Sequence, residues 1–189
     1  HSSHGLDNFV VITRSNKRAV QFKLQIRARV LWQEDDINVD DRLMVVANNY
    51  HWLAEHEELN TNLIANGDTL VVERITKRFT CYGVPFAEAD VRLVDNPDYP
   101  GFSVHLNLSV LTSDRANCTR AERQALYDHV ALEHADLGSK SAIHEAVQGD
   151  ACYQALQVKF AYALTCHKSQ GGQWPAVIVD QGYMTEDRM

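Results

Sequence analysis

The first thirty residues change from one hydrophobic pattern to another. Residues 9–13 form a continuous, mostly β-branched apolar run, which is typical of a strand covered on both faces. A polar turn follows, in which Ser15 or Asn16 can cap a helix. From residue 17 to about residue 32 apolar side chains recur at helical spacing, which predicts an amphipathic helix with a broad apolar face. The two segments together predict the start of a βα unit.

Short β-rich runs separated by turn residues fill the middle of the chain. An apolar run over 41–47 ends at the turn-prone pair 48–49, and Asn66-Gly67-Asp68 is a strong signal for a tight turn. Over 102–111 apolar and polar residues alternate, as in a strand with one buried face. The region from about 38 to 112 is therefore predicted to be a small antiparallel barrel or sandwich.

Helical patterns and then strand patterns return in the last third. Thr119 and Glu122 have the spacing of a capping box at the start of an amphipathic helix, and a short helix is expected over 141–147. Residues 156–164 are strand-like, and 174–180 are predicted to be the next buried strand.

These patterns divide the chain into two interleaved parts. An α/β domain is expected from residues 6–33 and 152–189, with residues 34–151 inserted as a β-barrel plus a helical segment. Residues 1–5 resemble the remnant of an expression tag and are excluded from the fold. Because the α/β segments are short and the sequence stops just after a strand-like run, we expect a fragment of a longer protein.

Composition narrows the protein class. The 189 residues are 45% hydrophobic and 23% charged, as in ordinary soluble proteins, and no apolar run reaches the ~18 residues that cross a bilayer. Four cysteines without a CxxC pair predict a reducing, cytoplasmic location. The net charge of −7 is weak evidence against nucleic-acid binding, but residues 8–33 contain six basic residues and no acidic residue. This basic segment either faces phosphates or is a solvated helix face.

The segment 165–173 contains the most promising chemistry. A predicted buried strand ends at Thr165, and open α/β sheets bind ligands at the carboxyl ends of their strands. Gly171 and Gly172 let the backbone approach another molecule closely. The side chains suited to donate to phosphates are those of Thr165, His167, Lys168 and Gln170. A glycine-containing turn with solvated polar side chains would explain the same residues.

Other catalytic and metal signals are weak. There is no phosphate loop, no dinucleotide-binding glycine pattern and no HExxH motif. Cys166 beside His167 suggests a thiol hydrolase, but chain neighbours rarely point their side chains at each other and no orienting acid is evident. Two histidine pairs have a spacing that does not favour metal binding and are interpreted as ordinary polar histidines: His51 with His56, and His129 with His134.

Four segments in order resemble superfamily 1 helicases of the RecD-like and UvrD-like group. The run from Thr165 to Gly171, with the strand after it, is similar to motif V of that family. Residues 11–18 resemble the strand-to-helix motif that opens its second RecA-like motor domain. Residues 41–50 and 65–68 resemble the two signatures of the small β-barrel that RecD-like helicases insert between these motifs, whereas about 79–150 is not covered.

This resemblance implies a fold and a function. The fold would be α/β, a partial RecA-like parallel sheet with an inserted small antiparallel β-barrel and extra helices. The function would be ATP-driven translocation on single-stranded DNA and duplex unwinding, with a role in DNA repair and with nuclease subunits as candidate partners. ATP and Mg2+ would be bound mainly outside this sequence, which lacks the phosphate loop, the magnesium acid and the last arginine motif, so the fragment alone should be inactive.

The resemblance and the donor chemistry name two groups of residues. The DNA-binding candidates are Arg14, Asn16, Thr165, His167 and Lys168, with Tyr50 of the barrel as a further stacking candidate. The nucleotide-binding candidates are Gln170, Gly171 and Gln173. Gln173 stands where the family often has an acid, so its contact to a ribose hydroxyl would lack charge. Asn48 and Asn49 are interpreted as turn residues.

Two hypotheses from other classes remain. A non-catalytic nucleic-acid-binding module on a helicase-like fold would have no phosphate loop in its parent gene. A hydrolase that uses Cys166 would be labelled rapidly by iodoacetamide at neutral pH, because an activated thiolate reacts much faster than a buried thiol.

Overall fold

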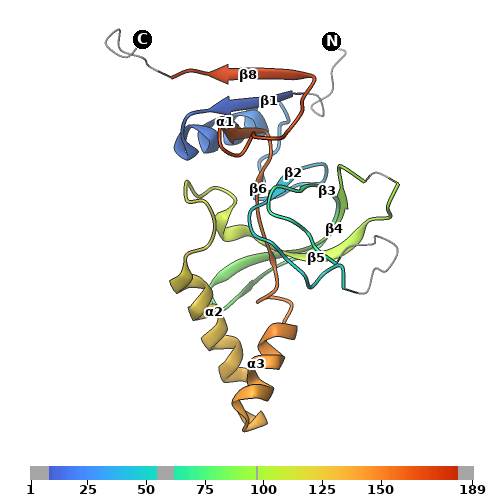
Figure 1. The fold of residues 1–189 in the computed structure, drawn as a ribbon, viewed down its shortest axis with the longest axis vertical. Coiled ribbons are helices and arrows are strands. Elements are labelled where there is room, and N and C mark those ends of the chain that lie inside the picture. Colours follow the sequence, from blue (N-terminus) through green and yellow to red (C-terminus); the bar gives the residue numbers. More distant parts are fainter. Residues whose placement is uncertain (1–8, 55–61, 97, 183–189) are drawn as a thin grey trace.

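The computed structural model describes residues 9–54, 62–96 and 98–182. Figure 1 shows three regions arranged in a column: a small parallel sheet with one helix, a β-barrel, and a helical hairpin. The tag-like residues 1–5 and His56 lie outside the described residues.

The parallel sheet has the strand order β7-β1-β8. β1 (Phe9–Thr13) lies between β7 (Ala163–Thr165) and β8 (Ala176–Asp180). Thr13 aligns with Thr165 on one side and with Asp180 on the other, so the three strands end at the same edge. The structure thus brings the two ends of the described chain into one sheet.

α1 (Asn16–Arg29) follows β1 and packs mainly on β1 and β7. Of the two candidate caps, Ser15 and Asn16, the helix uses Ser15, whose Oγ accepts a hydrogen bond from the Arg18 N–H at 3.3 Å. The helix buries Lys23 and Arg27. The basic segment is therefore not simply a solvated face, because two of its cations point into the molecule.

A closed barrel of five strands forms the middle of the molecule. Around the barrel the strands are β2 (Arg42–Val45), β3 (Thr69–Cys81), β4 (Val84–Leu93), β5 (Phe102–Asn107) and β6 (Leu156–Phe160). Neighbouring strands are antiparallel except β5 and β6, which pair in parallel. A small barrel was predicted and is present, but the predicted all-antiparallel barrel within about 38–112 is wrong in two respects. β6 comes from outside this region, and it closes the barrel between β5 and β2 with a parallel pair to β5.

The helical hairpin consists of α2 (Arg120–Glu133) and α3 (Lys140–Gly149), and it projects from the barrel at the end opposite the parallel sheet (Figure 1). The predicted capping box is present: the Glu122 N–H donates to Thr119 Oγ1 at 3.2 Å, and the Thr119 N–H donates to the Glu122 carboxylate at 2.8 Å. The hairpin packs on the barrel through a second apolar cluster that contains Phe86, Leu126, Val130 and Val147. Two short 3-10 helices, η3 (Leu108–Val110) and η4 (Ala135–Leu137), complete the regular elements.

The structure differs from the predicted strands in two places. The strand-like run 156–164 is divided, with β6 in the barrel and β7 in the parallel sheet, so the chain changes sheet at residues 161–162 rather than at residue 152. β8 was expected to be buried, but Val179 is 61% exposed and the two residues before it are also exposed. β8 lies at the edge of the described sheet (Figure 1) and pairs there only with β1, which leaves its apolar side chains uncovered.

A buried ion pair joins α1 to the barrel. The Arg27 guanidinium donates to both carboxylate oxygens of Asp41 at 2.9 Å, and both side chains are at least 95% buried. The Tyr162 hydroxyl donates to Asp41 at 2.9 Å and accepts from the Arg42 N–H at 3.1 Å. The guanidinium also lies over the Phe160 ring, 4.1 Å from its centroid. The charges of this joint can be buried because each has a well-placed partner.

Candidate nucleic-acid interface

The two turns predicted to contact DNA leave the parallel sheet side by side. Thr13 and Thr165 are paired in register, and each ends its strand. The Cys166 N–H donates to the Thr13 carbonyl at 3.1 Å, which holds the start of the second turn against the end of β1. Because β1 and β7 are parallel, both turns open at the carboxyl edge, where sheets of this type bind ligands.

The segment after β7 is a compact turn. The Lys168 N–H donates to the Thr165 carbonyl at 2.9 Å. Gly171 has φ +81°, a conformation that favours glycine. A Cβ on Gly172 would collide with the indole ring of Trp174. The expected close approach to Gly172 is thus made in this structure by Trp174 of the same chain.

Two hollows flank this turn, and Lys168 lines both. The polar residues of the first hollow are Asn16, Lys23, Lys159, Thr165 and Lys168. The second hollow lies between the turn and the barrel, and its lining includes Arg42, Thr69, Lys168, Gln170, Gly171 and Gln173. Thr165 thus lines the first hollow and the nucleotide-binding candidates line the second, whereas Lys168 lines both.

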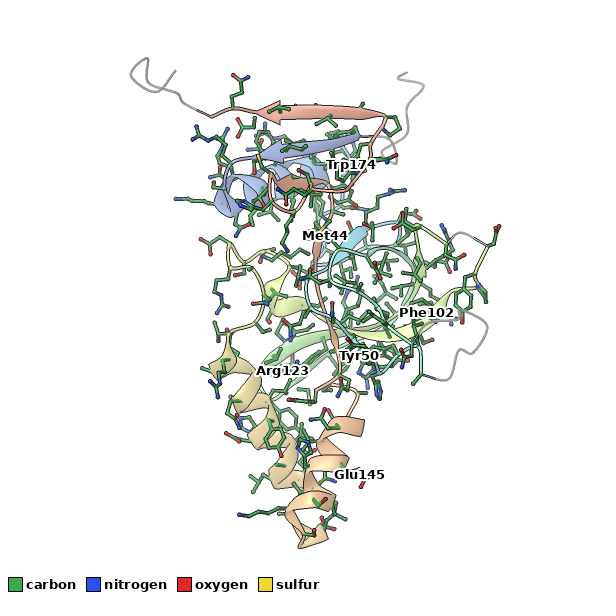
Figure 2. The ribbon with its side chains drawn as sticks, viewed as in Figure 1. Met44, Tyr50, Phe102, Arg123, Glu145 and Trp174 are labelled. Carbon is green, nitrogen blue, oxygen red and sulfur yellow. The ribbon has the colours of Figure 1, made fainter. Side chains whose placement is uncertain are left out.

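The remaining DNA-binding candidates lie outside the first hollow. Arg14 and His167 are exposed on their turns, next to Asn16 and Thr165 in the chain. Tyr50 is 58% exposed but lies on the barrel toward the helical hairpin, whereas Trp174 lies beside the parallel sheet (Figure 2). The structure therefore does not bring Tyr50 to the two turns.

Asn48 and Asn49 have the structural role expected of turn residues. The Asn49 amide donates to the Gln154 carbonyl at 2.8 Å, and its Oδ1 accepts from the His51 N–H at 2.9 Å. Asn48 Oδ1 accepts from the Asn66 N–H at 2.8 Å. The two barrel signatures in the sequence thus contact each other, which gives a packing reason for both.

The contacts of Cys166 do not resemble those of an activated nucleophile. Its thiol donates to the Thr13 carbonyl at 3.4 Å. Over the described ranges, no hydrogen bond joins Cys166 to His167 or to a carboxylate. The pairing of nucleophile and base that thiol catalysis needs is not formed there.

An ion pair ties the start of α1 to the end of β8. The Arg18 guanidinium donates to both carboxylate oxygens of Asp180 at 2.9 Å. This hydrogen bonding lowers the pKa of Asp180. The pair fixes the first turn of α1, which carries Asn16, relative to the carboxyl edge of the sheet.

Sequence reasoning missed two lysines at this edge. Lys23 and Lys159 are only 5% and 6% exposed. Burial, with the charge of Lys159 and then Lys168, lowers the pKa of Lys23 to about 7. Burial, followed by the charge of Lys168, lowers the pKa of Lys159 to about 8. The available signal was the position of Lys159 between the apolar residues Val158 and Phe160 of a strand.

Residues 160–189 match the family described as UvrD-like helicase C-terminal domain. This segment includes β7, the turn after it and β8. The match supports a relationship to superfamily 1 helicases. The comparison with curated proteins gave no match. None of the described helices is long and apolar enough to span a membrane.

Proposed function

We propose that the protein is part of an ATP-dependent DNA helicase of the RecD-like group, which couples ATP hydrolysis to translocation on single-stranded DNA and to duplex unwinding. The observation that supports this best is the register of Thr13 with Thr165, because it places the turns after β1 and β7 side by side. A DNA strand that crosses this edge would meet Arg14 and Asn16 on one turn and His167 on the other. The second turn belongs to the segment that matches the helicase family.

The opposite side of the second turn is the proposed nucleotide contact. The amides of Gln170 and Gln173 have the hydrogen-bonding chemistry to contact a ribose hydroxyl, and both line the second hollow. No group of three or more His, Cys, Asp or Glu side chains among the described residues could hold a metal ion. In the proposed motor, Mg2+ and most of the ATP are held by other segments. A turn that contacts both ligands couples their binding free energies.

The test is the ATPase activity of the full-length protein with and without single-stranded DNA. We expect DNA to stimulate hydrolysis, and we expect Thr165→Ala and His167→Ala to raise the DNA concentration for half-maximal stimulation by about tenfold, since each removes a hydrogen bond to a charged phosphate. His134→Ala, at the end of α2 in the helical hairpin, is the matched control and should leave that concentration unchanged.

Two results would contradict the proposal. DNA binding without any ATP hydrolysis would instead identify a non-catalytic nucleic-acid-binding module. Unchanged stimulation in His167→Ala would remove His167 from the DNA contact.

A further inference from the structure

Three lysines from three different elements meet around the first hollow. Lys23 comes from α1, Lys159 from β6 and Lys168 from the turn after β7. Asn16 and Thr165 complete the polar lining, and the other lining residues are apolar or alanine. The fold therefore brings Lys23 together with two lysines from the other end of the described chain in one small, mostly apolar space.

These lysines lack the partners that buried cations usually have. Within the described part of the chain, no ion pair joins a carboxylate to any of the three. Lys159 donates to the Ser113 carbonyl at 2.6 Å, and no hydrogen bond of the Lys23 ammonium is found among the described residues. Mutual repulsion and burial both disfavour three charges here unless an anion joins them.

The surroundings favour a phosphate group as that anion. Ammonium groups bind phosphate as compact point charges, and the Thr165 hydroxyl and Asn16 amide can add hydrogen bonds. The first turn of α1, which begins at Asn16, also borders the hollow, and the N-terminus of a helix attracts anions. All of these groups lie at the edge where the proposed DNA strand passes.

We propose that Lys23, Lys159 and Lys168 form a binding site for one backbone phosphate of single-stranded DNA. This site rests on the proposed function and extends it, because Lys23 and Lys159 lie outside the residues of the motif resemblance. Lys168 moves with the turn that also faces the second hollow. Nucleotide binding on the other side of this turn can therefore change how tightly the phosphate of the DNA is bound.

Bound phosphate should make the site take up protons. Lys23 faces Lys159 and Lys168, while Lys159 also feels the charges of Asp114 and Arg115. A nearby phosphate raises the lowered pKa values of Lys23 and Lys159, so protons bind together with DNA near neutral pH. Raising the pH through the range from about 7 to about 8 should weaken DNA binding, since the lysines then lose charge.

The main test measures single-stranded DNA binding by the full-length protein and its variants. Lys23→Met and Lys159→Met remove the charge and keep a long unbranched side chain. Each should weaken binding about tenfold and reduce the slope of log affinity against log salt by about one contact. Lys140→Met, at the exposed start of α3 in the helical hairpin, is the control and should change affinity by less than about threefold. Equal binding by Lys140→Met, Lys23→Met and Lys159→Met would overturn the proposal.

Two further measurements keep the test decisive. Calorimetric titration of the unmodified protein in two buffers of different ionisation enthalpy should show proton uptake on DNA binding at pH 7.5, and no uptake would contradict the proposal even if the variants do not fold. If inorganic phosphate or ATP binds at the lysines, and DNA binding does not depend on the lysines, then DNA is not the source of the bound phosphate. If DNA stimulates the ATPase activity but DNA binding does not depend on the lysines, the lysine site is rejected and the proposed helicase function is not.

Discussion

α1 buries two cations four residues apart, and they have opposite surroundings. Arg27 donates to both oxygens of Asp41 and stacks on Phe160, whereas Lys23 faces two further lysines. The first arrangement is typical of a structural joint, because each charge is matched inside the protein. The second leaves its charges unmatched in the described structure, which is typical of a site that waits for a ligand. Burial alone therefore does not distinguish a structural charge from a functional one. The partners of the buried charge make this distinction.

Removing Arg27 should have the largest effect on stability. In Arg27→Met the Asp41 carboxylate stays buried without its cation, and the free energy of unfolding should fall by about 3–5 kcal/mol. Urea denaturation followed by circular dichroism measures this loss. Arg29→Met, near the exposed end of the same helix, is the control and should change stability little. A loss below about 1 kcal/mol for Arg27→Met would mean that the pair is not the joint described here.

Removing Lys23 should shift stability in the opposite direction. The pKa of Lys23 is about 7 in the folded protein and about 10.4 in an unfolded chain, so the unfolded state binds more protons between these values. The unmodified protein should therefore gain stability as the pH rises from about 7 to about 10. Lys23→Met has no charge to bury at this position. It should therefore be more stable than the unmodified protein at pH 6, by an amount on the order of a few kcal/mol.

Urea denaturation at pH 6 and pH 9 without DNA tests this sign. The advantage of Lys23→Met should shrink at the higher pH, because Lys23 is then neutral in the folded state. Lys17→Met should show no such pH dependence. If Lys23→Met were destabilised equally at both pH values, Lys23 would be a packing residue and its contrast with Arg27 would disappear.

A smaller effect on stability is expected for a change in the turn that carries Lys168 than for loss of the Arg27–Asp41 ion pair. Gly172→Ala forces the added methyl group and the Trp174 ring apart, which shifts the turn that carries Lys168. We expect a loss of about 1–2 kcal/mol, a change in tryptophan fluorescence and weaker DNA binding. Gly149→Ala, at the end of α3 with open space around it, should be neutral or slightly stabilising. Unchanged fluorescence and DNA binding in Gly172→Ala would show that the turn tolerates the shift.

The sequence predicted the elements whose signals are local. The caps at Ser15 and Thr119 and the turn at Gly67 depend on nearby residues, and all three are present. It also predicted that Thr165 ends a strand at the carboxyl edge of a sheet, whereas the position of Asn16 at the same edge follows from the pairing of β1 with β7 in the structure.

The buried face of α1 was not predictable from hydrophobicity. The buried stripe is Ala19, Lys23, Ile26 and Arg27, while Leu24 and Val30 are exposed. Arg27 is buried against Asp41, and Lys23 is buried beside Lys159 and Lys168; these neighbours reach α1 only through the fold. The exposure of β8 has the same origin, because an apolar run does not tell whether a strand lies at the centre of a sheet or at its edge.

Amide hydrogen exchange of the full-length protein, with and without single-stranded DNA, tests whether the two turns bind DNA together. DNA should slow exchange at both residues 14–18 and residues 165–173, the two turns that leave the same edge of the sheet. No comparable protection is expected in the helical hairpin over 120–149. Protection confined to the hairpin or to the barrel surface around Tyr50, with both turns unchanged, would contradict this prediction.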